Sequence, residues 1–322
     1  MVRELDPAGS KWCVVVGDDH APEWVAYGAL ELRSVPVQYG CLGGTSTLLH
    51  SALHRAASIA PVSKILVTAL EEYRNRWEPI LWCVRPEMRF VGDKRTNSVL
   101  TSAAAILSIA RVSASSIVTI LPARCYVGHE WILHDALKQV ASELPHVPEG
   151  VATLGMIDID EGVDEDYMLV GRVRGGRGLE VRGVARRPTA WVARHLRRQG
   201  AVVSSGIMVG YAGIFAAHLA KHWPEITRRL TNLLVVAGVD QLERVVPGSL
   251  QDHMPGSGPR SPRWNPPILP QRAFPVCDCG WSSLKSAQAV ARVADFLATR
   301  AQRHQSPLPH PTTLSQSEPI AM

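Results

Sequence analysis

Short apolar runs alternate with segments of helical periodicity along most of this chain. Predicted strands cover residues 12–16, 64–68, 80–84, 116–121, 151–157 and 202–209. Apolar side chains recur at helical spacing in residues 47–58, 98–111, 129–144, 189–199, 212–222, 225–234 and 286–299. This alternation predicts an α/β fold of three layers, in which helices cover both faces of a mixed, mostly parallel sheet.

Turn and loop signals divide the rest of the chain. Residues 167–173 and 179–184 flank a glycine-rich turn and predict a hairpin. Residues 247–275 are rich in proline, glycine, serine and arginine, which predicts a long loop. Residues 1–10 form a polar N-terminal extension, and the polar, proline-bearing tail 300–322 is predicted to be disordered. One domain, residues 11–299, remains.

Positive charge is concentrated in one part of the chain. The formal net charge is +5, and nine of the arginines lie between residues 172 and 198. We favour a solvated basic face, and the alternative is an anion site for a phosphorylated ligand. Within this stretch only Trp191 offers a stacking surface, which argues against a nucleic-acid partner, although a basic nucleic-acid-binding module stays the weakest alternative.

Composition gives little support for a metal site or a membrane segment. Cys277 and Cys279 form a C-x-C pair without a second pair, which is a poor zinc signature, and most of the six cysteines are predicted to be reduced and buried. The acidic segment 158–166 lacks a recognisable ligand spacing, so a solvated loop is predicted there, with a divalent-cation site as the minor alternative. No apolar run is long enough to cross a bilayer, which predicts a cytoplasmic protein without membrane contact.

The first predicted strand opens into a loop of unusual composition. The apolar run ends at Gly17 and continues as Asp18-Asp19-His20-Ala21-Pro22. A first strand that leads into a glycine-bearing loop is a common phosphate-binding arrangement in α/β proteins. The two carboxylates would repel phosphate, and Pro22 removes a backbone N–H donor.

Six strings in a fixed order carry a resemblance to a known family. They are PVQYG at 36–40, GGTSTLL at 43–49, ILPARCYV at 120–127, RRP at 186–188, VSSGIMV at 203–209 and PVCDCGWSSL at 275–284. In that order they resemble strings of the bacterial sugar-1-phosphate nucleotidyltransferases, particularly the mannose-1-phosphate guanylyltransferase branch. The resemblance spans residues 11–299 and implies the Rossmann-like fold of nucleotide-diphospho-sugar transferases.

The resemblance also implies a reaction and a site. The family transfers a nucleotidyl group from a nucleoside triphosphate, GTP in this branch, to a sugar 1-phosphate, with Mg²⁺ as cofactor, and this branch makes GDP-mannose. Position by position, it implies nucleotide or phosphate contacts at Gly17, Asp18, Gln38 and Arg187, and a sugar contact at Ser204. Arg124 and Ser283 stand where the family has its two metal-binding aspartates, so no metal ligand is implied here.

The differences from the family lie mainly at the positions that the resemblance implies for binding phosphate, sugar and metal. Beyond the altered loop and the two lost aspartates, Val37 replaces a phosphate-binding lysine and Ser204 an asparagine, whereas Arg187 keeps its positive charge. These changes predict that nucleotidyl transfer is weak or lost. Two hypotheses stay open: a working nucleotidyltransferase, or an inactive relative that binds or regulates a partner such as an active paralogue.

Overall fold

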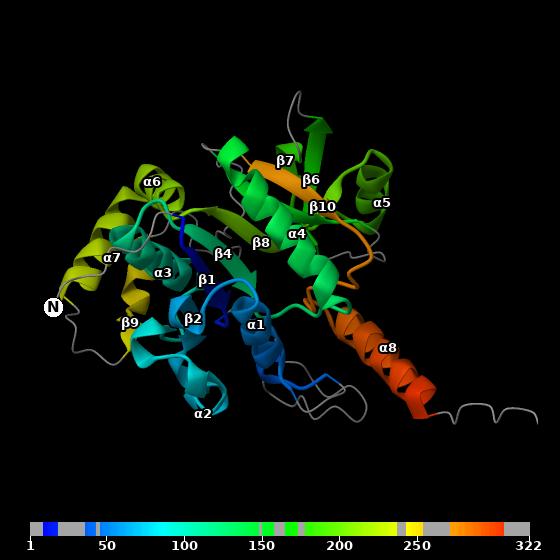
Figure 1. The fold of residues 1–322 in the computed structure, drawn as a ribbon, viewed down its shortest axis with the longest axis horizontal. Helices are drawn as coiled ribbons and strands as arrows, with labels where there is room; N and C mark the ends of the chain where they lie inside the picture. The colour runs from blue at the N-terminus through cyan, green and yellow to red at the C-terminus, as the bar shows by residue number, and fades with distance from the viewer. Residues whose placement is uncertain are drawn as a thin grey trace, which may run out of the picture.

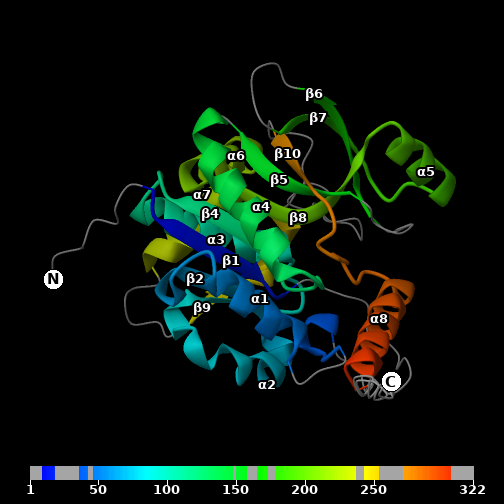
Figure 2. The same cartoon turned by 45° about the vertical axis from the view of Figure 1, so that its right-hand side comes forward.

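The computed structural model describes residues 9–18, 36–42, 46–147, 150–157, 165–172, 178–236, 243–253 and 271–305. In these residues a ten-stranded sheet has the order β5-β10-β7-β6-β8-β4-β1-β2-β3-β9. The strands are β1 (Lys11–Val16), β2 (Ile65–Leu70), β3 (Arg89–Gly92), β4 (Ile117–Pro122), β5 (Val151–Met156), β6 (Tyr167–Arg172), β7 (Leu179–Ala185), β8 (Val202–Tyr211), β9 (Arg244–Val246) and β10 (Gln271–Val276). Figures 1 and 2 show the arrangement from two directions.

The sheet has two parts of different character. Strands β9, β3, β2, β1 and β4 pair in parallel, as the alternation of strands and helices predicts. Beyond β4, strand β8 runs antiparallel to β4, β5 and β6, and β7 runs antiparallel to β6 and β10. Because β5 pairs with both β8 and β10, this second part curls toward a barrel. The mixed α/β sheet is confirmed, whereas its predicted mostly parallel character is not, because the β6–β7 hairpin and β8 impose antiparallel pairing.

Helices cover both faces of the parallel part. The helices are α1 (Leu48–Ala57), α2 (Arg74–Trp77), α3 (Ser98–Val112), α4 (Glu130–Glu143), α5 (Ala190–Arg198), α6 (Ala212–His222), α7 (Pro224–Val236) and α8 (Ala287–Gln305). Short 3-10 helices lie at Val37–Tyr39, Val62–Lys64, Glu71–Tyr73, Ile80–Cys83, Pro86–Met88, Leu144–His146 and Gly248–His253.

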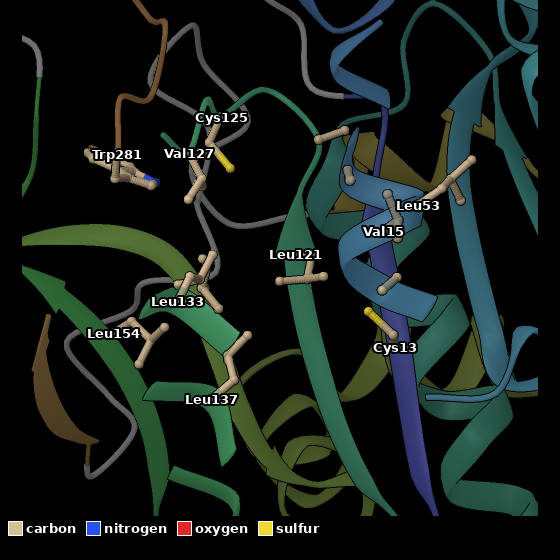
Figure 3. Packing of buried hydrophobic residues seen from close by; sticks show 14 of the residues in the cluster. Cys13, Val15, Leu53, Leu121, Cys125, Val127, Leu133, Leu137, Leu154 and Trp281 are labelled. Carbon is tan, nitrogen blue, oxygen red and sulfur yellow. The ribbon is translucent and has the colours of Figure 1, made fainter. Parts of the chain in front are cut away.

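Strand β1 is buried on both faces, and its alternate residues belong to different core clusters. Cys13 and Val15 pack in the cluster that includes residues of α1 and α4, as Figure 3 shows. Val14 packs in the cluster formed with α3, α6 and α7. Successive side chains of a strand point to opposite faces, so one apolar run supplies both cores. This division confirms helices on both faces of the sheet.

Two predicted segments differ from the structure. Residues 80–83 form a 3-10 helix, Ile80–Cys83, and the next strand is β3 instead. The guanidinium of Arg89 donates hydrogen bonds to the carbonyls of Leu81 and Val84, which supports a turn where sequence pattern indicated a strand. The predicted loop 247–275 overlaps β10, which pairs with β5 and β7, while residues 254–270 lie outside the described part.

The C-terminal helix α8 continues past residue 299 to Gln305, into the stretch predicted to be disordered. Residues 306–322 and 1–8 lie outside the described part of the chain. Within the described residues, no helix is both long enough and apolar enough to span a membrane.

Candidate functional site

The carboxyl end of β1 is fixed by hydrogen bonds to Gly17. Its N–H donates to the carbonyl of Thr68 at 3.1 Å, and its own carbonyl accepts from Gln38 Nε2 and from the hydroxyl of Tyr39, both at 3.0 Å. A Cβ atom at Gly17 would lie 2.7 Å from the Thr68 carbonyl oxygen, so the close approach requires glycine. Gln38 is therefore buried against the end of β1, as the alignment of the two strings implies.

Asp18 is fully buried, and its carboxylate binds the protein itself. Oδ1 accepts a hydrogen bond from the hydroxyl of Thr68, and Oδ2 accepts one from the hydroxyl of Thr101, each at 2.5 Å. Hydrogen bonds to an ionised acceptor are short and strong, so the two threonines compensate for burial of this carboxylate. A contact between Asp18 and nucleotide stays a prediction, and Asp19 to Pro22 lie outside the described residues.

Arg124 follows β4 at the same end of the sheet and is buried. The N–H of Ala123 donates to the carbonyl of Val16 at 2.9 Å, which holds the end of β4 beside the end of β1. Tyr126 then forms an antiparallel bridge with Ser282, through backbone hydrogen bonds of 2.9 and 3.0 Å. The segments that carry Arg124 and Ser283 therefore lie side by side, although they are far apart in the sequence.

Val37, where the family has a lysine, lies near the same segment. It is fully buried in a small apolar cluster that also contains Leu48 of α1 and Leu284. The positions of Asp18, Val37, Arg124 and Ser283 thus gather at one end of the sheet. This is the arrangement that the order of the sequence strings implies.

Glu165, two residues before β6, bonds to the segment that carries Ser283 and Lys285, and the sequence did not single it out. Ser283 donates its hydroxyl hydrogen to Glu165 Oε1, and the ammonium of Lys285 donates to Oε2. The Glu165 and Lys285 side chains are only 8% and 16% exposed, so this ion pair is largely shielded from water. The hydroxyl of Ser283 is therefore engaged within the protein.

Asp166, the next residue, connects the two remaining positions. Its Oδ1 accepts from the backbone N–H of Arg187 at 3.2 Å, and its carbonyl accepts from the N–H of Ser204 at 2.8 Å. Ser204 is buried on β8, whereas the Arg187 side chain is exposed and its backbone has a positive φ of 41°. Glu165 and Asp166 are both buried, so the predicted solvated loop is wrong for these two residues, and residues 158–164 lie outside the described part.

The described residues do not fit a magnesium site. Magnesium prefers carboxylate and water oxygens in near-octahedral geometry. The two positions that correspond to the family's aspartates carry a guanidinium and an engaged hydroxyl, and no group of three His, Cys, Asp or Glu side chains in the described part could hold a metal ion. A positive charge at Arg124 favours an anion over a cation at this place.

A cavity of about 480 Å³ adjoins the Tyr126–Ser282 bridge. Its walls include the aromatic rings of Tyr126, Trp281 and Phe296, and Arg292 of α8 also lines it. Its volume lies in the range of small-molecule sites. The cavity shares Tyr126 and Ser282 with this end of the sheet, and none of the residues predicted to contact nucleotide, phosphate or sugar lines it.

Sequence reasoning missed Glu165, Asp166 and Lys285 as members of this site. Glu165 and Lys285 are 120 residues apart, and neither belongs to a periodic pattern or to one of the matching positions. The only available signal was the acidic segment itself, whose last two residues directly precede a strand. Its contacts depend on how the chain folds back on itself.

Comparison with known proteins gives a fold and no closer relationship. No protein-family model and no curated protein matches this chain. The crystal structure of mannose-1-phosphate geranyltransferase from Thermus thermophilus is similar, with a TM-score of 0.64 at 20% identity over 88% of this chain and 79% of that one. Mannose-6-phosphate isomerase from Helicobacter pylori has a TM-score of 0.60 at 15% identity, over 85% of this chain and 99% of that one.

A third solved structure is that of a putative glucose-1-phosphate thymidylyltransferase from Bacillus anthracis. Its TM-score is 0.53 at 10% identity, over 89% of this chain and 95% of that one. At such low identities the similarity establishes the fold alone. The chain therefore shares its fold with these solved structures, which agrees with the fold that the six sequence strings imply.

Proposed function

We propose that this protein binds a sugar phosphate or a nucleotide at the end of β1 and β4, and that metal-dependent nucleotidyl transfer there is weak or lost. It then serves as a binding or regulatory partner, for example of an active paralogue. Mannose 1-phosphate and GTP are the expected ligands, following the guanylyltransferase branch that the sequence strings resemble. The observation that carries the proposal is the engagement of Ser283 by Glu165, itself paired with Lys285.

The physical argument concerns charge in the transition state. Transfer between phosphates develops negative charge that a divalent metal and cationic groups must neutralise. Losing one such preorganised group costs roughly 3 kcal/mol, or about two to three orders of magnitude in rate. Arg124 and Ser283 replace both metal-binding positions, so the loss of rate is expected to be larger than for either change alone.

Binding has better support than turnover. Arg187 is exposed beside the buried Asp166, and Arg124 lies at the end of β4. A guanidinium pairs well with phosphate oxygens, because its N–H donors match them in a fork. These cations also carry the second candidate function, a working transferase in which arginine and lysine side chains neutralise the phosphates in place of a metal.

The test measures binding and turnover on the same protein. Purified full-length chain is mixed with nucleoside triphosphates, mannose 1-phosphate and magnesium, and pyrophosphate release is followed while calorimetry measures binding. We expect binding without steady pyrophosphate release, and Arg187→Ala should weaken binding about tenfold or more, as expected for a lost charged hydrogen bond of about 1.5–3 kcal/mol.

Arg198→Ala, at an exposed position on α5, is the matched control and should leave binding unchanged. Steady pyrophosphate release that Arg187→Ala abolishes would favour the second candidate and refute the first. Failure of every nucleotide and sugar phosphate to bind would refute both.

A further inference from the structure

Two histidines far from this site lie on one face of α6. His218 and His222 are one helical turn apart, and their ring centroids are 4.3 Å apart with the planes inclined at 41°. Helix α6 follows the end of β8 where Tyr211 pairs with Ile117, the first residue of β4. Helix α6 therefore begins at the opposite end of β4 from Arg124, and it lies next to α7 (Figure 1).

The ring nitrogens that face inward have no partner in the described part of the chain. Nε2 of His218 and Nε2 of His222 are both buried without a hydrogen bond, although the two residues as wholes are half-buried. A buried polar atom without a partner costs about 1–3 kcal/mol, so native proteins rarely keep several together. Two unpartnered imidazole nitrogens on adjacent turns of one helix point to a polar ligand that both bind.

The two imidazoles have the spacing of a metal-chelating pair. Histidines at i and i+4 project from one face of a helix and can bind one ion together.

The surroundings select the class of ion. Glu225, the nearest acidic residue along the chain, accepts hydrogen bonds from Arg228 and Arg229 and is thereby engaged. A site built of imidazole nitrogens without carboxylates suits zinc, nickel or copper better than magnesium or calcium. We propose that His218 and His222 together bind one divalent transition-metal ion through their Nε2 atoms, with water completing the coordination.

A second pair with the same spacing provides a stringent comparison. His50 and His54 also lie one turn apart, on α1, but both are exposed and His50 Nδ1 hydrogen-bonds the hydroxyl of Thr47 at 3.0 Å. Exposed imidazoles are hydrated and must be ordered before they chelate an ion, which reduces their affinity. The pair on α6 is half-buried, its Nε2 atoms are buried, and its two rings already lie against each other.

The experiment titrates the metal-free, untagged full-length protein with Ni²⁺ in a calorimeter. We expect one tight equivalent, and its affinity should fall at least about tenfold in His218→Ala and in His222→Ala, because each variant loses the chelating partner. The control His54→Ala should keep the tight equivalent. Ultraviolet absorption should show no thiolate-to-nickel charge transfer, which separates this site from the six cysteines.

Folding of the variants is checked by thermal unfolding without metal, and His222→Gln repeats the test with a polar side chain that retains more of the volume. Absence of a tight equivalent would overturn the proposal. So would a tight equivalent that survives both α6 substitutions, or one that disappears in His54→Ala.

Discussion

The ion pair between Glu165 and Lys285 gives the sharpest test of how the site is held. Lys285→Met removes the ammonium and keeps most of the side-chain volume. The buried carboxylate of Glu165 then keeps the hydroxyl of Ser283 as a donor and loses its counter-charge. A buried carboxylate without a counter-charge is destabilising, so the free energy of unfolding should fall.

The magnitude follows from burial. Two unit charges about 4 Å apart attract by roughly 4 kcal/mol at an effective dielectric constant of about 20. Removing one partner of a buried pair costs about 3–5 kcal/mol. The Lys285 side chain is 16% exposed, which lets water screen part of the interaction, so we expect a loss of about 3 kcal/mol. The double variant Glu165→Gln/Lys285→Met leaves no unpaired charge and should recover most of this loss.

The assay is urea unfolding followed by tryptophan fluorescence. Arg182→Met is the matched control, because Arg182 pairs with Glu180 in an ion pair whose side chains are 64% and 57% exposed. An exposed pair contributes about 0–1 kcal/mol, so the control should change little. Equal, small losses in Lys285→Met and Arg182→Met would refute the reasoning that Glu165 is buried and held by a counter-charge.

Two further predictions test burial at the end of β1 and in its core. Thr101→Val removes a hydroxyl donor to the fully buried Asp18 and should lower the free energy of unfolding by about 1.5–3 kcal/mol in the same urea assay; no loss would contradict this contact. Burial raises the pKa of the Cys13 thiol far above its usual range, so iodoacetamide at pH 8 should modify the exposed Cys83 and Cys277 first and Cys13 only in urea, as read by peptide mass spectrometry. Rapid labelling of Cys13 in the native protein would contradict its burial.

The spacing of apolar residues along the chain predicted several individual strands and helices. The run at residues 12–16 lies within β1, and the segments at 47–58 and 98–111 correspond to α1 and α3. These predictions succeed because the spacing of apolar residues indicates which side of a helix or strand is buried. The run at residues 80–84 failed because its turn is fixed by Arg89, a residue beyond the run itself.

The order of the six strings also predicted which distant positions meet. Segments around Gly17, Gln38, Arg124 and Ser283 gather at one end of the sheet, in agreement with the implied alignment. What each residue does at that place was harder to predict. Asp18 was interpreted as a loop carboxylate that would face phosphate, and the structure turns it toward two threonine hydroxyls.

The sequence by itself predicted an α/β protein that opens on an apolar strand, and its resemblance to the nucleotidyltransferases implied that two metal-binding aspartates are replaced. Only the tertiary structure decided that half of the sheet is antiparallel, that Glu165 holds Ser283 and Lys285, and that the Nε2 atoms of His218 and His222 are buried. The physical reason is the separation along the chain of the residues that interact. The periodicity of apolar residues indicates which side of a single helix or strand faces solvent. Ion pairs and hydrogen bonds between distant segments depend on distances that are set only when the chain packs.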